Sequence, residues 1–414
     1  MMQSYKEILA SAIAAANLPS RALDVGECQS PTGQRCSLCY AVRLSYADEA
    51  RLKDEELQRV WKDWRFTAEL ARLVRSPLGR GYRTTTKRRV FPYRDTVCLG
   101  LIAPSEEGEM RPFPVVRCVI EPQEHCAIFH HVQESFVKPY AKKLARATSY
   151  VVIKGTSAEQ TLIFNVKDIS PELVRSANTL SKSLTRSFPS IIGIFLYADT
   201  SSPQYYLGRQ RGRSRTSFRK LYGKSEVYHR VLGRSFLYSP LSFSQVNQSI
   251  LERVIREAQA LLQPKNDAKL YDLYCGYGLF ALCLAGNVRE VIGVESSSAS
   301  IASAFANARR QRVNNARFLL SDINQETIGR IMTAAQPGDA VILDPPRKGT
   351  AEGVIEFIAA TRPARVVHIF CAVDLMPKEL KRWERAGYTV VCAVPFDMFP
   401  GTPEVEILVL LEPA

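Results

Sequence analysis

After residue 240 the chain alternates between short apolar runs and helical segments, and this alternation constrains the fold more than any other feature. The apolar runs that predict strands are residues 269–274, 290–294, 316–320, 340–343, 365–370 and 389–394. A series of strands joined by helices forms a parallel sheet that is covered on both faces. A last run, 405–411, follows only a short loop, so we expect it to join the edge as an antiparallel strand. The sequence therefore predicts an α/β domain over residues 240–414.

The first 239 residues divide into three stretches of different character. Residues 1–44 predict a surface helix followed by a cysteine-bearing loop. Residues 45–73 hold a strongly amphipathic helix, which we expect to link to the C-terminal domain or pack on it. Residues 74–239 change to short alternating or β-branched runs, such as 150–154 and 191–197. Such runs are typical of an α+β domain with an antiparallel sheet.

Charge is distributed unevenly along the chain, whose formal net charge is +14. Residues 251–414 carry 18 Lys and Arg against 19 Asp and Glu, whereas the first 250 residues carry 37 against 22. A neutral part joined to a basic part favours a small-molecule unit coupled to a polyanion-binding unit, although a solubilising surface is the plainer alternative. No apolar run is long enough to span a bilayer, and the ten cysteines suit a reduced, cytoplasmic protein.

A glycine-rich loop follows the first predicted strand of the C-terminal domain and opens a helix. It contains Tyr274, Gly276 and Gly278, and glycines there let a ligand approach the backbone, although a simple tight turn gives the same pattern. Glu295 ends the next strand, where a carboxylate can bind a ribose diol, and Asp322 follows the third strand, within reach of an adenine amine. This spacing resembles class I methyltransferases more than nicotinamide enzymes.

Two further residues follow the fourth and fifth strands. Asp344 begins the sequence Asp-Pro-Pro-Arg-Lys-Gly, and Cys371 follows the fifth strand. The carboxyl ends of parallel strands face one ligand crevice, so both side chains are expected at one site, although a small buried Cys is the common alternative. Glu404 and Glu406 share a face of the last strand, and alternation alone does not separate them.

Four motifs, in order, resemble one known family. Residues 243–247 read Phe-Ser-Gln-Val-Asn, 272–278 Asp-Leu-Tyr-Cys-Gly-Tyr-Gly, 344–349 Asp-Pro-Pro-Arg-Lys-Gly and 397–400 Asp-Met-Phe-Pro. Together they resemble the RNA 5-methyluridine methyltransferases of the bacterial rRNA and tRNA type, over about residues 28–411. The resemblance implies a class I, Rossmann-like methyltransferase domain that uses S-adenosylmethionine, and a central α+β domain that binds RNA.

The resemblance also implies roles for individual residues. Cys371 would add to carbon 6 of a uracil, which makes carbon 5 nucleophilic, and Glu406 would later remove the carbon 5 proton. The short interval after Asp-Met-Phe-Pro selects Glu406 over Glu404. The residues expected at the cofactor are Gln245, Tyr274, Gly276, Gly278, Glu295, Asp322 and Asp344, the last of which would also hold the uracil.

The chain departs from the family pattern at two places. Phe370, Ala372 and Val373 flank Cys371, where the family has Ser-Cys-Asn-Pro. Gly401 stands where a His is common. Nucleophile and base are present, so the expected activity is kept, with the rate and the substrate fit left open.

Three clustered cysteines, Cys28, Cys36 and Cys39, have C-x7-C-x2-C spacing. They resemble the iron–sulfur loop of the family's rRNA-directed branch, which takes a fourth ligand from downstream. Cys126 fits that position better than Cys98 or Cys118. Four thiolates can hold a [4Fe–4S] cluster or a zinc ion, and the resemblance favours iron–sulfur.

Basic stretches with interleaved aromatic residues at 80–89 and 209–224 suit single-stranded or loop RNA, although each taken alone is also typical of a solvated loop. Only 27 residues precede Cys28, so the β-barrel domain of some relatives is not expected. These features favour a monomeric 23S rRNA enzyme. The alternatives are a tRNA uracil-C5-methyltransferase, an amino-directed methyltransferase, for which Arg347 replaces the expected aromatic residue, and an RNA chaperone with weak catalysis.

Overall fold

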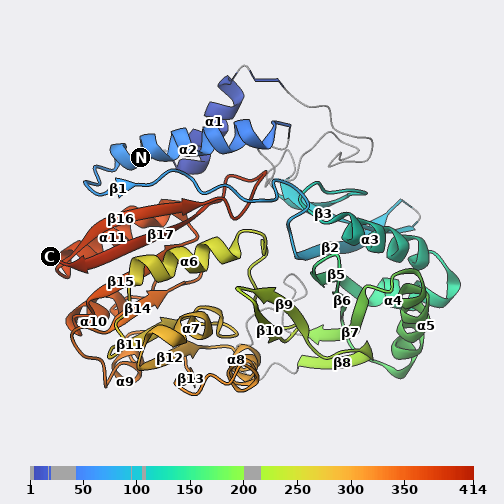
Figure 1. Cartoon of the computed structure of the whole chain (residues 1–414). Coiled ribbons are helices and arrows are strands. Elements are labelled where there is room, and N and C mark those ends of the chain that lie inside the picture. Colours follow the sequence, from blue (N-terminus) through green and yellow to red (C-terminus); the bar gives the residue numbers. More distant parts are fainter. Residues whose placement is uncertain (1–3, 17, 20–42, 95, 105–108, 200–215) are drawn as a thin grey trace.

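The chain forms two lobes, each built on one sheet (Figure 1). The computed structural model describes residues 4–414 except 17, 20–42, 95, 105–108 and 200–215. Among the described helices, none has the length and hydropathy that a membrane span requires.

The C-terminal lobe contains an eight-stranded sheet in the order β1-β16-β17-β15-β14-β11-β12-β13. Its strands are β1 (Glu69–Leu70), β11 (Lys269–Leu273), β12 (Glu290–Glu295), β13 (Ala316–Leu320), β14 (Ala340–Leu343), β15 (Arg365–Phe370), β16 (Tyr388–Phe396) and β17 (Glu406–Pro413). The strands from β11 to β15 pair in parallel, as the alternation of strands and helices predicts. The predicted α/β fold of this domain is confirmed.

The predicted edge position of the last strand is wrong. β17 is antiparallel, as expected, but it lies between β15 and β16 and pairs with both. Its first six residues are all buried, which suits an interior strand, whereas β16 has several exposed positions. The edge beyond β16 is taken by the two-residue strand β1, which comes from far upstream in the chain.

Helices cover both faces of this sheet. They are α1 (Tyr5–Ala15), α2 (Tyr46–Asp63), α6 (Leu251–Leu262), α7 (Leu279–Leu284), η2 (Ala285–Asn287), α8 (Ser298–Arg310), α9 (Ile328–Ile331), α10 (Val354–Ala360), η3 (Val373–Leu375) and α11 (Met376–Arg385). On one face, α1 and α2 share a core with α10 and α11, to which α2 contributes Leu57, Val60 and Trp61. On the other face, α6, α7 and α8 pack with the hairpin β9 (Val227–Val231) and β10 (Arg234–Tyr238). Helices α1 and α2, which come first in the chain, therefore belong to the C-terminal lobe.

The second lobe contains a seven-stranded sheet in the order β4-β3-β2-β5-β6-β7-β8. Its elements are β2 (Thr85–Tyr93), β3 (Thr96–Pro104), β4 (Met110–Pro114), α3 (Gln123–Phe136), η1 (Pro139–Ala141), α4 (Lys142–Ala147), β5 (Thr148–Gly155), β6 (Gln160–Val166), α5 (Pro171–Ser187), β7 (Ile191–Asp199) and β8 (Thr216–Gly223). The sheet is antiparallel except that β6 and β7 are parallel, because α5 carries the chain across between them. Helices α3, α4 and α5 cover one face (Figure 1).

Candidate active site

The predicted site residues of the C-terminal lobe gather where its parallel strands have their carboxyl ends. Asp344 follows β14, Cys371 follows β15, and Asp322 comes shortly after β13. β17 runs in the opposite direction, so its first residue, Glu406, lies at this same end of the sheet. Phe370 pairs with Ile407 in the sheet, which places Cys371 and Glu406 on adjacent strands.

The glycine-rich loop after β11 has an unusual backbone. Tyr274, Gly276 and Gly278 have φ angles of 70°, 56° and 84°, in the left-handed region that favours glycine. A Cβ added at Gly276 would meet no atom within 4 Å, so this position is open. A Cβ added at Gly278 would lie 3.2 Å from the Phe318 ring, so this glycine is required by packing. The backbone at Gly276 is therefore the part of the loop that a ligand can approach.

Two acids hold this loop. Glu295, at the end of β12, accepts hydrogen bonds from the Gly276 amide at 3.3 Å and from the Ser297 amide at 2.8 Å. Asp272, in β11, accepts a bond of 2.7 Å from the Ala281 amide in the first turn of α7. Burial raises the pKa of Asp272 to about 7. The Asp272 carboxylate thus joins β11 to α7, and the Glu295 carboxylate joins β12 to the glycine-rich loop.

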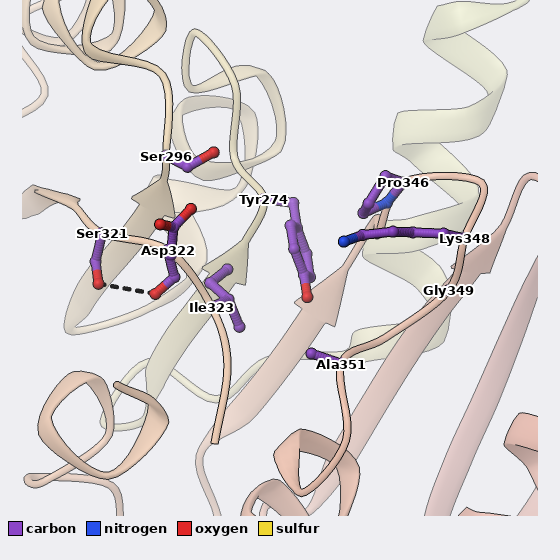
Figure 2. Close-up of a pocket in the computed structure, with 9 residues that line it drawn as sticks. All are labelled: Tyr274, Ser296, Ser321, Asp322, Ile323, Pro346, Lys348, Gly349 and Ala351. Atoms are coloured by element: carbon purple, nitrogen blue, oxygen red, sulfur yellow. Dashed lines mark hydrogen bonds between the residues drawn. The ribbon is translucent and has the colours of Figure 1, made fainter. Parts of the chain in front are cut away.

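A hollow of about 380 Å³ opens beside the loop (Figure 2). Its lining residues are Tyr274, Ser296, Ser321, Asp322, Ile323, Pro346, Lys348, Gly349 and Ala351. The Tyr274 ring stands between Asp322 and Ile323 on one side and Pro346 and Lys348 on the other, and the Lys348 side chain extends toward it. The hollow thus combines an aromatic ring, apolar walls and polar groups.

Several of these lining residues were not expected from the sequence. Pro346 and Lys348 belong to the Asp344–Gly349 motif, so membership of that motif is the signal in the sequence that points to them. Ser296 and Ile323 directly follow Glu295 and Asp322, and this adjacency is their only signal in the sequence. The structure brings Tyr274 and Asp322 to the hollow, whereas Glu295 contacts it through the loop.

Asp344, Cys371 and Glu406 form a second group next to the hollow. The Cys371 thiol donates to the carbonyl oxygen of Pro345 at 3.7 Å. Gln245 Nε2 donates to Asp344 Oδ2 at 3.3 Å, which joins the predicted Gln to this group. The loop that follows β14 therefore contacts the thiol through Pro345 and lines the hollow through Pro346.

The surroundings of this group raise the pKa of each of its three members. Burial raises the pKa of Cys371 to about 12, with further increases from Asp344 and Glu406 and an opposing effect of Arg347. Burial and the nearby Asp344 raise the pKa of Glu406 to about 8, again opposed by Arg347. Burial raises the pKa of Asp344 to about 7. Burial thus disfavours negative charge on these groups, and the Arg347 guanidinium favours it on Cys371 and Glu406.

The two glutamates near the start of β17 have different surroundings. Glu404 Oε1 contacts Lys6 Nζ at 2.7 Å and Arg347 Nη1 at 3.0 Å. In the described part of the chain, the Glu406 carboxylate has no such ion pair. Glu404 is therefore engaged as an anion, whereas Glu406 is free to exchange a proton.

Three of the four predicted metal ligands, Cys28, Cys36 and Cys39, lie outside the described residues. Cys126 lies in the first turn of α3, where its Sγ is 3.7 Å from Glu121 Oε2. Among the residues that the structure describes, no three His, Cys, Asp or Glu side chains form a metal-binding group.

Comparison with known proteins agrees with this geometry. A family model described as tRNA (Uracil-5-)-methyltransferase matches residues 207–414. An uncharacterised RNA methyltransferase of Geobacter sulfurreducens is 35% identical over 235 residues, which are 56% of this chain and 45% of the relative. The 23S rRNA (uracil(1939)-C(5))-methyltransferase RlmD of Aeromonas hydrophila is 39% identical over 181 residues, 44% of this chain and 40% of the relative. The chain thus spans less than half the length of these two curated relatives.

The fold also matches a solved structure over most of its length. The tRNA (uracil-54, C5)-methyltransferase of Pyrococcus abyssi, solved with S-adenosyl-L-homocysteine, superposes with a TM-score of 0.66 at 20% identity. The match covers 90% of this chain and 85% of that one, so both lobes share its fold. The family model covers half of the chain, including the candidate site residues from Gln245 to Glu406. The chain therefore belongs to the tRNA (uracil-5-)-methyltransferase family.

Proposed function

We propose that the chain transfers a methyl group from S-adenosylmethionine to carbon 5 of a uridine in RNA. The observation that carries this proposal is the placement of a thiol and two carboxyl groups on adjacent strands beside a hollow lined by an aromatic ring. Family membership supports the same reaction.

The residues that line the hollow and those of the glycine-rich loop beside it fit S-adenosylmethionine. Gly276 leaves its backbone open, Glu295 can accept from ribose hydroxyls, and Asp322 can accept from an adenine amine. Tyr274 and Ile323 supply apolar contact. When bound, the cofactor supplies an electrophilic methyl group.

Cys371 is the proposed nucleophile. Its thiol loses a proton, and the thiolate then adds to carbon 6 of the uracil, so that the electron pair of the ring double bond moves toward carbon 5. Arg347 favours the thiolate by its charge. Asp344 and Gln245, joined by a hydrogen bond, would hold the uracil edge.

Glu406 is the proposed base. Once carbon 5 carries the methyl group, the Glu406 carboxylate takes the carbon 5 proton, the ring double bond re-forms, and the Cys371 thiolate leaves. A pKa of about 8 makes Glu406 a stronger base than an ordinary carboxylate. The ion pairs of Glu404 support the assignment of this role to Glu406.

The covalent step can be tested by trapping. RNA that carries 5-fluorouridine has no proton at carbon 5 to lose, so it should remain attached to the wild-type protein and not to Cys371→Ala. Glu406→Gln should accumulate the same adduct on ordinary uridine RNA, whereas the matched change Glu404→Gln should not. Methylation retained by Cys371→Ala would contradict the mechanism.

The proposed substrate is 23S rRNA, as the printed name of the Aeromonas relative suggests. Mass-spectrometric mapping of 5-methyluridine, in cells with and without the gene, should show one site lost from 23S rRNA. Loss from tRNA instead would favour the tRNA alternative. Rescue of a deletion strain by Cys371→Ala would favour a chaperone role.

We also propose that Cys28, Cys36, Cys39 and Cys126 hold a [4Fe–4S] cluster, with zinc as the alternative. Burial and the neighbouring Glu121 carboxylate raise the pKa of Cys126, and the buried Arg88 guanidinium opposes them, so a bound metal would supply the charge that stabilises the thiolate. Iron and sulfide analysis of anaerobically purified protein should give about four of each per chain. Cys126→Ser should lower both, Cys98→Ser should not, and stoichiometric zinc without iron would contradict the proposal.

A further inference from the structure

The first turn of α1 contacts two segments of the candidate active site directly and a third through Glu404. The Tyr5 amide donates to Asp374 Oδ1 at 2.7 Å, and Asp374 lies in the loop that carries Cys371. Lys6 Nζ contacts Glu404 Oε1 at 2.7 Å, in the loop that leads to Glu406. The same Glu404 oxygen accepts from Arg347 Nη1 at 3.0 Å, in the loop that carries Asp344. One turn of helix thus bears, directly or through Glu404, on the loops of all three reacting groups.

This turn is itself held firmly. Tyr5 and Leu9 are 1% and 0% exposed and belong to the core that covers one face of the large sheet. The Tyr5 hydroxyl donates to the Lys53 carbonyl oxygen in α2 at 3.4 Å. Ser4 and Glu7 form reciprocal side-chain to backbone bonds that fix the start of the helix. Lys6 therefore projects from a rigid base.

The contact at Lys6 bears on the charge around Cys371. The charged groups that act on this thiol are Asp344, Glu406 and Arg347, and only Arg347 favours the thiolate. Glu404 forms ion pairs with both Arg347 and Lys6, so the three side chains together carry one net positive charge. Without Lys6, Glu404 would neutralise Arg347, and this cluster beside the thiol would lose its net positive charge.

We propose that Lys6 is a positioning residue of the methylation site, which holds Arg347 effective beside Cys371 by sharing Glu404 with it. This role rests on the proposed function of Cys371. It assigns a positioning role to a lysine that lies 365 positions before the nucleophile in the sequence and acts on it only through other side chains.

Alkylation of Cys371 tests this role without RNA or cofactor. The rate at which iodoacetamide modifies Cys371 at pH 8, followed by mass spectrometry of its peptide, reports the thiolate fraction. Lys6→Met should lower the rate about threefold, the effect of a half-unit rise in thiol pKa, and Lys6→Arg should restore it. The matched control is Lys143→Met, which removes another exposed lysine paired with a glutamate, in the other lobe.

The direction of the change separates positioning from loosened packing. A site that merely opened would be alkylated faster, so an unchanged or higher rate in Lys6→Met would overturn the proposal. The difference from wild type should also shrink in 1 M salt, because Lys6 is 41% exposed and its charge can be screened. If the wild type and every variant lack methylation while alkylation still depends on Lys6, the proposed function is refuted. The effect of Lys6 on the Cys371 thiol would still stand.

Discussion

Asp344 and Glu406 are two carboxyl groups that act on the Cys371 thiol from the strands on either side of β15. Each raises the pKa of Cys371, and Asp344 also raises that of Glu406. The pair is useful for a base that must take a proton from carbon, because a carboxylate that resists ionisation holds a proton more strongly.

The rate at which methylated RNA is released from Cys371 should therefore depend on pH with an alkaline midpoint. A base works only when it is deprotonated, and the pKa of Glu406, raised to about 8, moves that requirement above neutrality. Single-turnover rates should rise from pH 6 through pH 8. Arg347 lowers the pKa of Glu406, so Arg347→Met should shift the rise to higher pH, whereas Arg385→Met, on the exposed side of α11, should not. A rise centred near pH 4.5 in the wild type would contradict this role for Glu406.

At the scale of elements, buried ion pairs hold α2 against the rest of the C-terminal lobe. Lys53 Nζ lies 2.9 Å from both Asp397 Oδ1 and Glu49 Oε1, and all three side chains are fully buried. Glu49 also pairs with Arg80 and accepts from the Gly401 amide. The network thus joins α2 to the loop between β16 and β17, which leads to Glu406.

Lys53→Met should destabilise the protein strongly, because it leaves two buried carboxylates with less compensation. A loss of about 3–5 kcal/mol in the free energy of unfolding is typical of such a change. Arg51→Met is the matched control, since Arg51 lies on the same helix but is 45% exposed and should cost under about 1 kcal/mol. Urea unfolding followed by circular dichroism measures both, and equal losses would contradict a structural role for the buried network.

The elements differ in how far the sequence could predict them. β13, β14 and β15 begin and end where their apolar runs do, because each run is bounded by turn signals. The place of β17 was missed, since pairing order depends on partners and not on local pattern. β1 has only two residues and no periodicity to detect. The contact between Lys6 and Glu404 spans 398 positions, which neither motif nor spacing encodes.

At the scale of the whole molecule, basic charge lies in the part of the chain that includes the second lobe, and the exposed strand β8 combines charge with aromatic rings. Phe218 and Lys220 pair with Tyr197 and Phe195, so both lie on one face of the sheet, and Phe218 is 39% exposed. Tyr222 is 44% exposed but follows a bulge and pairs with Ile194, on the other face. Phe218 stacks on Phe195 at 4.6 Å between ring centroids, on the sheet face without helices. A cation beside an exposed ring suits an unpaired RNA segment.

Salt dependence should separate the two kinds of contact at β8. A cation that meets a phosphate releases a counterion, so Lys220→Gln should reduce the slope of log affinity against log salt by about 0.7 for single-stranded RNA. Phe218→Ala should weaken binding by about 1–3 kcal/mol at every salt concentration and leave the slope unchanged, because stacking releases no ions. Lys381→Gln and Phe305→Ala, at exposed positions of the C-terminal lobe, are the matched controls. Fluorescence anisotropy with a labelled oligonucleotide gives both quantities, and equal effects of the β8 variants and the controls would exclude this strand from the RNA-binding surface.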